Sequence, residues 1–231
     1  MADPNLEQLI SAALILRPML DELVFVGGCT TGLLITDPAT PEVRATVDVD
    51  AIVEITSYAA YADFSVRLNK LGLRVDTEAG APICRWRHGE LRIDVMPLDE
   101  NILGFSNRWY RLALDTAQLV KLNDDVSIRA INAPFFLATK MEAFRGRGQG
   151  YLGSHDLEDI IAVVDGRGSL VDEVRASDPK VREYIAAQTQ SMLNERAFRD
   201  AIPGFLTPDT ASQDRVPMIF DRLQQLVTLD K

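Results

Sequence analysis

The sequence contains little of what secreted, membrane-spanning or thiolate-metal proteins need. Its 231 residues include only two cysteines, Cys29 and Cys84, whose spacing is neither that of a zinc site nor that of a C-x-x-C motif. No apolar run approaches the ~20 residues of a transmembrane helix. The first ten residues lack the basic-then-apolar order of a signal peptide. We therefore expect a protein of the reduced cytoplasm, without a membrane segment.

Excess positive charge is absent as well. The formal net charge of -10 argues against a broad nucleic-acid surface, which is normally basic. Basic residues gather in two local stretches, namely Arg85, Arg87, His88 and Arg92 in one and Lys140, Arg145 and Arg147 in the other. Either stretch alone is typical of a solvated face. The sequence also lacks internal repeats and low-complexity tracts, which leaves one or two ordinary globular domains.

Residues 23–53 hold the features around which the chain is organised. The apolar run 23–26, typical of a strand, ends at Gly27-Gly28 and is followed by small residues. Because glycine adopts backbone angles that other residues avoid, the pair by itself indicates a turn. The backbone amides of such a turn could approach a triphosphate, and a helix beginning at residues 31–35 would present its N-terminus to the anion.

A second run typical of a strand, residues 46–53, carries Asp48 and Asp50. Strand side chains alternate between faces, so the two carboxylates are expected on one face and the valines between them on the other. A pair of acids on a strand can simply be a solvated face. However, aspartate is depleted in strands, and like charges held side by side repel unless a cation neutralises them. The combination favours a metal site.

A third carboxylate has a similar setting. Asp94 lies between apolar neighbours on the short strand expected at residues 91–96. Carboxylate oxygens are the ligands that Mg²⁺ prefers, and Mg²⁺ keeps further positions for water and substrate phosphates. Two such ions can stabilise both the attacking and the leaving oxygen of a phosphoryl transfer.

The periodicity predicts an α/β (α+β) fold with a small mixed sheet and flanking helices over residues 1–131, followed by an all-helical part over 132–231. Expected helices cover 6–20, 31–35, 57–71, 134–144, 156–164, 178–198 and 216–229, and expected strands cover 23–26, 46–53, 73–76, 83–87 and 91–96. Residues 102–131 are expected to contain short strands. Residues 145–150, basic and rich in glycine, are expected to form a loop.

Two charged residues stand out in the helical part. Lys140 lies on a helix that otherwise has the pattern of a core helix. It can be a residue whose stem is buried and whose amine reaches solvent, or it can reach a bound phosphate. Asp156 follows Ser154, the expected N-cap, so it can simply stabilise the first turn of its helix.

The motifs together resemble a known superfamily. Val26-Gly27-Gly28, residues 46–50 (Thr-Val-Asp-Val-Asp) and residues 92–95 (Arg-Ile-Asp-Val) are similar to the nucleotidyltransferase superfamily of the DNA polymerase β type. Residues 137–144 and 156–160 are similar to the AbiE-like nucleotidyltransferases of abortive-infection and toxin–antitoxin systems. The resemblance covers most of residues 22–165.

The resemblance implies metal and catalytic roles for five residues. Asp48 and Asp50 would bind Mg²⁺, and Asp94 would complete the catalytic metal site and help to deprotonate the attacking hydroxyl. Lys140 would contact the nucleotide phosphates. Asp156 would be a further acidic residue of the site.

The resemblance also implies that Gly27 and Gly28 cradle the triphosphate. The family often has serine after the glycine pair, where this chain has Cys29, so a hydroxyl contact would come from Thr30 or Thr31. The family also often has arginine before the helical aspartate, where this chain has His155.

The expected function is a Mg²⁺-dependent nucleotidyltransferase that transfers a nucleoside monophosphate from an NTP to an acceptor hydroxyl and releases pyrophosphate. Within the family, acceptors include tRNA 3′ ends and proteins, and a cognate antitoxin is an expected partner. The alternatives are modification of a small molecule, such as an antibiotic, and a non-catalytic nucleotide-binding regulatory module. The presence of all three aspartates argues against the last alternative.

Overall fold

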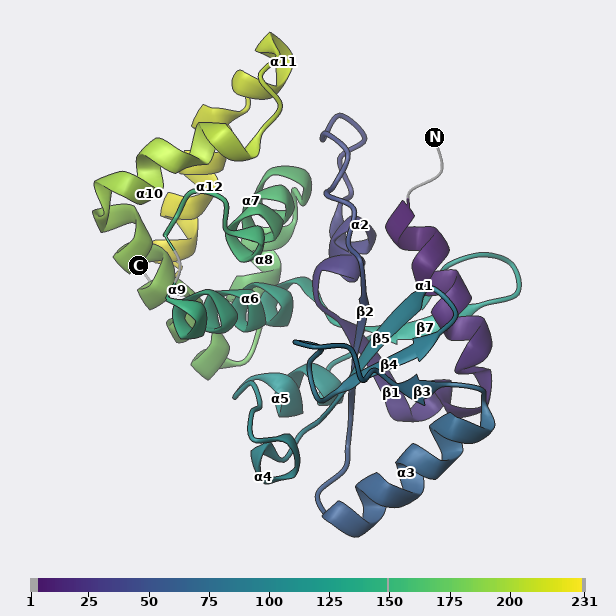
Figure 1. The fold of residues 1–231 in the computed structure, drawn as a ribbon. Coiled ribbons are helices and arrows are strands. Elements are labelled where there is room, and N and C mark those ends of the chain that lie inside the picture. Colours follow the sequence, from purple (N-terminus) through teal and green to yellow (C-terminus); the bar gives the residue numbers. More distant parts are fainter. Residues whose placement is uncertain (1–3, 149, 230–231) are drawn as a thin grey trace. The chain divides into compact units, whose positions relative to one another are not determined.

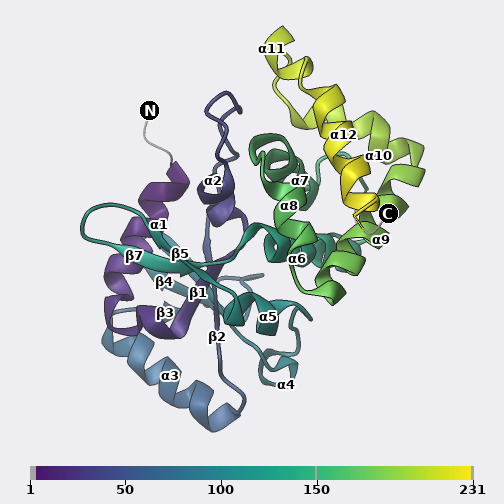
Figure 2. The same cartoon turned by 180° about the vertical axis from the view of Figure 1, so that it is seen from behind.

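The computed structural model describes residues 4–148 and 150–229 (Figure 1), and Figure 2 shows it from the opposite side. Contacts between residues divide the chain into two compact units. The first unit, here called the sheet unit, contains the chain up to Gly32 and Ala45–Asn132. The second, here called the helical unit, contains Leu33–Arg44 and the chain from Ala133 onward. The predicted division into two domains, residues 1–131 and 132–231, stays a prediction.

In the described part of the chain, seven strands form one mixed sheet in the order β3-β4-β5-β2-β1-β7-β6. The strands are β1 (Leu23–Val26), β2 (Val49–Val53), β3 (Arg74–Val75), β4 (Arg85–His88), β5 (Leu91–Pro97), β6 (Gln118–Lys121) and β7 (Ser127–Ala130). β2 pairs in parallel with β5 and antiparallel with β1, and β1 pairs in parallel with β7. The other three pairs are antiparallel hairpins. The mixed sheet and the helical remainder confirm the expected fold class.

The central strands form the core of the sheet unit. All four residues of β1 are buried, as expected for an apolar strand that is covered on both faces. α1 (Pro4–Ile15) packs against β2 and β5, and α5 (Tyr110–Asp115) packs against β2. These two helices lie on opposite sides of the strands in both views (Figures 1 and 2).

The helix expected at residues 6–20 is shorter than predicted. It ends at Ile15, and the 3₁₀ helix η1 (Arg17–Glu22) follows with Pro18 in its first turn. Proline fixes its own backbone angle and lacks the amide that a continuing α-helix needs. By contrast, α3 (Tyr58–Lys70) begins as predicted, with the Ser57 hydroxyl accepting a hydrogen bond from the backbone amide of Ala60.

The strand that carries the paired aspartates also starts later than predicted. It begins at Val49, and Val47 is 67% exposed instead of buried. Before the strand, the backbone amide of Thr46 donates a hydrogen bond to Asn5 Oδ1 at 2.8 Å. The backbone amide of Thr46 is thus satisfied by a side chain and not by a neighbouring strand, and residues 46–48 do not take part in the hydrogen bonds of the sheet.

Residues 98–131 contain more helix than expected. The predicted short strands are β6 and β7, but α4 (Glu100–Leu103) and α5 precede them. The Asp99 side chain caps α4 by accepting the amide of Asn101, and Gly104 ends the helix in a left-handed conformation.

The helical unit contains helices that the sequence predicted and short ones that it did not. Its elements are α6 (Ala133–Arg147), α7 (His155–Gly166), α8 (Leu170–Arg175), α9 (Pro179–Asn194), α10 (Arg196–Ala201), η3 (Ile202–Phe205), α11 (Thr210–Gln213) and α12 (Val216–Val227). Residues 145–147, expected in a loop, form the last turn of α6 instead. No helix in the described ranges combines the length and apolarity that crossing a bilayer requires.

The segment Leu33–Arg44 is fastened to α7 although it lies far from it in sequence. The backbone amides of Thr36 and Asp37 both donate to the carbonyl oxygen of Gly166 at 2.9 Å. A Cβ at Gly166 would lie 2.6 Å from Ile35 Cδ1, so a larger residue at this position would force the Ile35 side chain to move. The loop between the glycine turn and the paired aspartates is therefore part of the helical unit.

Candidate active site

Two of the predicted carboxylates are neighbours in the sheet. Asp50 of β2 and Asp94 of β5 are direct partners in the parallel register between these strands. Asp48 lies just before β2. Asp94 is buried, with 6% of its surface exposed, and Asp48 and Asp50 are half-buried. The fold thus brings together two of the motifs that the sequence analysis identified separately.

Gly27 connects the glycine turn to these carboxylates. Its φ of 74° lies in the left-handed region that favours glycine. A Cβ at this position would lie 1.9 Å from Asp50 Oδ2, so the carboxylate occupies the space of a side chain. The preceding residue, Val26, is the antiparallel partner of Asp50. The predicted phosphate-binding turn and the predicted metal ligand are therefore in contact.

The residues after Gly27 form a tight turn that leads into a short helix. The 3₁₀ turn η2 (Gly28–Thr30) is followed by α2 (Thr31–Leu34), near the helix expected at residues 31–35. The Thr30 hydroxyl donates to the carbonyl oxygen three residues earlier at 2.9 Å, and the Cys29 thiol does the same at 3.2 Å. Thr31 Oγ1 is buried without a hydrogen-bond partner among the described residues. Both threonine side chains are buried. Their contact with a nucleotide stays a prediction.

Arg85 connects Asp48 and Asp94. Its Nε donates to Asp94 Oδ1 and its Nη2 to Asp94 Oδ2, each at 2.8 Å, which is the bidentate arginine–carboxylate geometry. Nη2 also donates to Asp48 Oδ2. Arg85 lies on β4 directly opposite Asp94 in the antiparallel register, so the hairpin β4–β5 fixes this contact. In the sequence, Arg85 stands out only as part of a basic stretch typical of a solvated face.

The electrostatic environment of this group follows from burial. Burial raises the pKa of Asp94 above its ordinary value, although the Arg85 hydrogen bonds act in the opposite direction. The same hydrogen bonds raise the pKa of Arg85, which is charged throughout the physiological range. Burial, with a smaller contribution from Asp94, raises the pKa of Cys84 to about 12. Cys84 is therefore a buried neutral thiol and not a nucleophile.

The donor atoms of the group suit a hard cation. Asp48, Asp50 and Asp94 supply only carboxylate oxygens, as Mg²⁺ prefers. The Arg85 guanidinium already holds positive charge against two of them, so it stands in for a cation at this place. With the side chains in these positions, no group of three or more acidic, histidine or cysteine residues in the described ranges could hold a metal ion. The chemistry of the donors fits Mg²⁺, and the position of Arg85 competes with it.

The two predicted site residues of the helical unit are also in contact with each other. Lys140 Nζ lies 3.3 Å from Asp156 Oδ1 and 2.7 Å from Asp159 Oδ2. Asp156 and Asp159 are each 2% exposed, and the Lys140 side chain is 12% exposed. Lys140 is therefore a largely buried, ion-paired lysine and not a surface residue. Its contact with a nucleotide stays a prediction.

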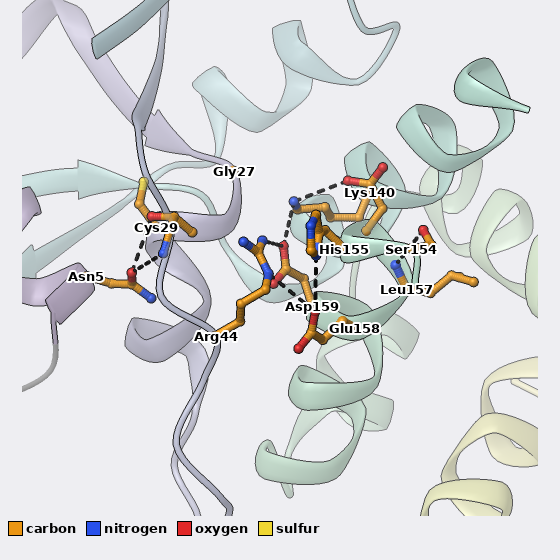
Figure 3. A network of polar contacts seen from close by, with 12 residues as sticks. Asn5, Gly27, Cys29, Arg44, Lys140, Ser154, His155, Leu157, Glu158 and Asp159 are labelled. Carbon is orange, nitrogen blue, oxygen red and sulfur yellow. Dashed lines mark hydrogen bonds and ion pairs between the residues drawn. The ribbon is translucent and has the colours of Figure 1, made fainter. Parts of the chain in front are cut away.

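Two arginines complete this group. Arg147 Nη1 lies 2.5 Å from Asp156 Oδ2, and Arg44 Nη2 lies 3.5 Å from Asp159 Oδ2. Arg44 Nε also lies 3.3 Å from a carboxylate oxygen of Glu158. Figure 3 shows the nitrogen atoms of Arg44 and Lys140 beside the Asp159 carboxylate, with Glu158 near Arg44. We call Arg44, Lys140, Arg147, Asp156, Glu158 and Asp159 the helical ion cluster, and Arg85, Asp48, Asp50 and Asp94 the sheet cluster.

The neighbouring N-terminus of α7 explains the position of Asp156. The Ser154 hydroxyl accepts a hydrogen bond from the backbone amide of Leu157, which confirms the predicted N-cap (Figure 3). Asp156 thus lies in the first turn, where a negative charge is favourable. His155, at the position where the resembling family often has arginine, lies 3.3 Å from Glu158 and is mostly exposed.

Sequence reasoning missed Arg85, Arg44 and Asp159 as members of these clusters. The signal for Arg85 was its place on a strand facing Asp94 across a two-residue turn, which a hairpin register would have revealed. The signal for Asp159 was its spacing of three residues from Asp156 on one helix. Arg44 carried no signal, because it comes from a loop far away in sequence.

Among known proteins, only solved structures gave matches to this chain. No protein-family model matches the sequence, and no curated protein matches it either. Among solved structures, an antigenic nucleotidyltransferase-like protein from Paracoccidioides brasiliensis is similar with a TM-score of 0.51 and 16% identity, over 86% of this chain and 93% of that one. The fold of this chain is nucleotidyltransferase-like. JHP933 from Helicobacter pylori covers 96% of this chain and 92% of its own, with 9% identity and a TM-score of 0.47.

The nucleotidyltransferase-like fold supports the general part of the resemblance inferred from the motifs. At this level of identity the likeness concerns the fold alone.

Proposed function

We propose that the protein is a Mg²⁺-dependent nucleotidyltransferase. The observation that carries the proposal is the contact between Gly27 and Asp50, with Asp94 as the register partner of Asp50. A phosphate-binding turn and a set of carboxylates are useful together when a nucleoside triphosphate and a divalent cation bind at one place. The nucleotidyltransferase-like fold supports the same reaction class.

In this reaction the acceptor hydroxyl oxygen attacks the α-phosphorus of the NTP. The new P–O bond forms as the bond between the α- and β-phosphates breaks, and pyrophosphate leaves. Asp48, Asp50 and Asp94 would hold Mg²⁺, which would neutralise the phosphates and acidify the acceptor hydroxyl. The turn at Gly27 and Gly28 would let backbone amides approach the triphosphate.

Asp94 is the residue suited to receive the proton of the acceptor hydroxyl. It is the most buried of the three carboxylates, and the resemblance implies this role for the residue at its position. Lys140 would supply a positive charge to the phosphates. For this it has to exchange at least one of its two carboxylate partners for a phosphate oxygen.

The AbiE-like resemblance specifies the proposal further. We infer an acceptor hydroxyl on a macromolecule, with the tRNA 3′ end as the first candidate and a protein hydroxyl as the second, and a role as the toxin of a toxin–antitoxin pair. A location in the cytoplasm belongs to the same proposal. The net charge of -10 requires that an RNA acceptor be bound by a local basic patch.

One experiment tests the reaction. The protein is incubated with each α-³²P-labelled NTP, Mg²⁺ and, separately, total cellular RNA or lysate protein, and the labelled product is identified. We expect label in one macromolecular class, none with EDTA and none with Asp50→Asn. Absence of transfer with all four NTPs and both acceptor pools would contradict the proposal.

A second experiment tests the toxin role. Expression in a bacterial host is expected to arrest growth for the wild-type protein and not for Asp50→Asn at equal protein levels. Equal growth of the two strains, in conditions where the wild type transfers nucleotide in vitro, would contradict the toxin role and leave the reaction in place.

A second candidate function is a non-catalytic nucleotide-binding module. The position of Arg85, which neutralises Asp48 and Asp94 without a metal, favours this candidate. It predicts that an NTP raises the melting temperature of the protein equally with Mg²⁺ and with EDTA, and that no acceptor becomes labelled.

A further inference from the structure

Arg85 takes the place in the sheet cluster where a cation is expected. Its guanidinium is bidentate on Asp94, and the same Nη2 also reaches Asp48. The side chains of Arg85 and Asp94 are 14% and 9% exposed, whereas that of Asp48 is 26% exposed. The bridge therefore has a buried, doubly bonded end at Asp94 and a more accessible, singly bonded end at Asp48.

The two ends differ in how firmly they are fixed. Arg85 and Asp94 are opposite each other in the β4–β5 hairpin, so backbone hydrogen bonds hold both residues in place. Asp48 precedes β2 and has no ladder partner. Separation of Asp48 from Arg85 therefore requires only side-chain movement, whereas separation of Asp94 from Arg85 would break two charge-assisted hydrogen bonds.

We propose that Arg85 is a resident counter-cation, which a divalent cation displaces from Asp48 when it binds. This inference rests on the proposed function, because it takes Asp48 and Asp94 as metal ligands. Arg85 is then a positioning residue with two states. Without metal it holds the two carboxylates, and with metal it gives up the Asp48 contact.

The physical reason is competition for the same negative charge. A guanidinium at hydrogen-bond distance lowers the affinity of its carboxylates for any other cation by Coulomb repulsion. The bridge also protects the metal-free protein, since two carboxylates drawn together without a cation would repel. An Nη2 released from Asp48 keeps its N–H groups, and arginine binds phosphate well. The displaced group is thus suited to a phosphate oxygen of the incoming nucleotide.

The chain provides a matched control. Arg87 lies two residues further along β4, therefore on the same face of the strand, and pairs with Glu78. Glu78 is 61% exposed and not part of the sheet cluster. Arg87→Gln removes the same charge from the same strand without touching Asp48 or Asp94.

The test measures Mn²⁺ binding without nucleotide, by the loss of the free Mn²⁺ signal in electron paramagnetic resonance. We expect Arg85→Gln to bind Mn²⁺ on the order of tenfold more tightly than the wild type, since it removes one positive charge from the ligands. Arg87→Gln is expected to match the wild type within about twofold. Mn²⁺ is also expected to raise the melting temperature of Arg85→Gln more than that of the wild type.

Unchanged or weaker Mn²⁺ binding by folded Arg85→Gln would overturn the proposal, as would equal tightening in Arg87→Gln. If Arg85→Gln folds only when Mn²⁺ is present, the cation replaces the guanidinium and the proposal is supported. If it does not fold in either condition, Arg85→Lys decides, because a single ammonium cannot reproduce the bidentate bridge. Tighter Mn²⁺ binding by Arg85→Lys than by the wild type supports the proposal, and equal or weaker binding overturns it.

The labelled-NTP assay separates this inference from the proposed function. If the wild type transfers nucleotide and Arg85→Gln binds Mn²⁺ no more tightly than the wild type, the counter-cation role of Arg85 is contradicted and the proposed reaction is supported. If no transfer is found and Arg85→Gln binds Mn²⁺ more tightly, the proposed reaction is contradicted and the counter-cation role of Arg85 is supported.

Discussion

The sheet cluster and the helical ion cluster both hold carboxylates against cations, but they are neutralised differently. Asp48 and Asp94 share the single guanidinium of Arg85. Asp156 and Asp159 share Lys140. In addition, Asp156 has a contact with Arg147, and Asp159 has one with Arg44.

The difference indicates what each cluster is suited to do. A buried carboxylate with two cationic partners is fixed from two directions, which is the arrangement of a structural contact. Two carboxylates that share one cation keep lone pairs for a further cation. We therefore expect the sheet cluster to carry the chemistry, and the helical ion cluster to contribute to stability first and to phosphate binding second.

The sharpest test of this comparison replaces one aspartate in each cluster. Asp50→Asn is expected to lower nucleotide transfer on the order of a thousand-fold, because it removes charge from the proposed metal ligands. Its melting temperature is expected to stay near that of the wild type. Asp156→Asn is expected to lower the melting temperature by several degrees, because it leaves Arg147 without its charged partner and leaves Lys140 with Asp159 alone. Transfer rates and melting curves of both variants measure these effects.

The opposite pattern would break the comparison. If Asp156→Asn keeps its melting temperature and loses transfer as completely as Asp50→Asn, the helical ion cluster is part of the chemistry. Asp178→Asn is the matched control, since Asp178 also lies at a helix N-terminus, where its side chain accepts the amide of Lys180.

A further group of ion pairs, formed by Arg215 with Asp37 and Asp165, lies outside both clusters and offers a comparison with them. Arg215 lies 2.7 Å from both Asp165 Oδ1 and Asp37 Oδ2, and it fastens the segment Leu33–Arg44 to α7. Burial raises the pKa of Asp165, while Arg215 acts in the opposite direction. Arg215→Gln is expected to destabilise the protein by about 3 kcal/mol near neutral pH, because it leaves a buried carboxylate without its ion pair.

The effect of Arg215→Gln is expected to depend on pH. Without Arg215, the folded-state pKa of Asp165 rises further above its unfolded value, so the folded variant binds a proton more readily than the unfolded one. Stability contributed by this group is then present at low pH and is lost as the pH rises through the folded-state pKa. The difference between variant and wild type is therefore expected to shrink as the pH falls through the folded-state pKa of Asp165 in the variant, and to be smallest below about pH 4, the ordinary aspartate pKa. Urea unfolding at several pH values measures it, and a constant difference would contradict the role of Asp165.

The sequence was informative about the sheet cluster because its residues lie on local patterns. The run before Gly27, the alternation around Asp50 and the apolar neighbours of Asp94 each indicate a strand, and strands of one small sheet place such residues near one another. The helix after Ser57 and the N-cap at Ser154 were likewise predictable from local hydrogen bonding.

Features that depend on contacts between distant segments were not predictable in this way. The late start of β2 follows from the hydrogen bond between Asn5 and Thr46, which are 41 residues apart. The contact between Arg44 and Asp159 spans 115 residues. Local periodicity does not predict contacts between such distant residues, and these contacts can override the strand propensity of a segment.

A smaller effect is expected when the shared cation of the helical ion cluster is removed. Lys140→Met keeps the unbranched apolar stem of the side chain and removes its charged end, while Arg147 and Arg44 remain beside Asp156 and Asp159. We expect a loss of about 2 kcal/mol in the free energy of unfolding, less than for an ion pair with a single cation. Urea unfolding of Lys140→Met, Asp159→Asn and the double variant measures the coupling. The double variant is expected to be more stable than the sum of the single losses predicts, and exact additivity would show that the 2.7 Å contact contributes nothing.

The smallest expected effect concerns the contact that connects the glycine turn to the sheet cluster. Gly27 and Gly104 both have a positive φ, 74° and 80°, so alanine is strained at either position. Their ψ angles differ, -170° at Gly27 and 5° at Gly104, and the conformation of Gly27 is the more restrictive of the two. A Cβ at Gly104 would meet nothing within 4 Å, whereas a Cβ at Gly27 would lie 1.9 Å from Asp50 Oδ2. Gly104→Ala therefore measures the strain of a left-handed residue without a steric contact, about 1 kcal/mol. Gly27→Ala is expected to cost at least about 1 kcal/mol more, because its backbone conformation is open essentially to glycine alone and because Asp50 has to turn away from its preferred position. If the sheet cluster carries the chemistry, Gly27→Ala also lowers nucleotide transfer while Gly104→Ala does not. Equal stability and equal transfer of the two variants would show that the glycine turn and Asp50 are neighbours without a common function.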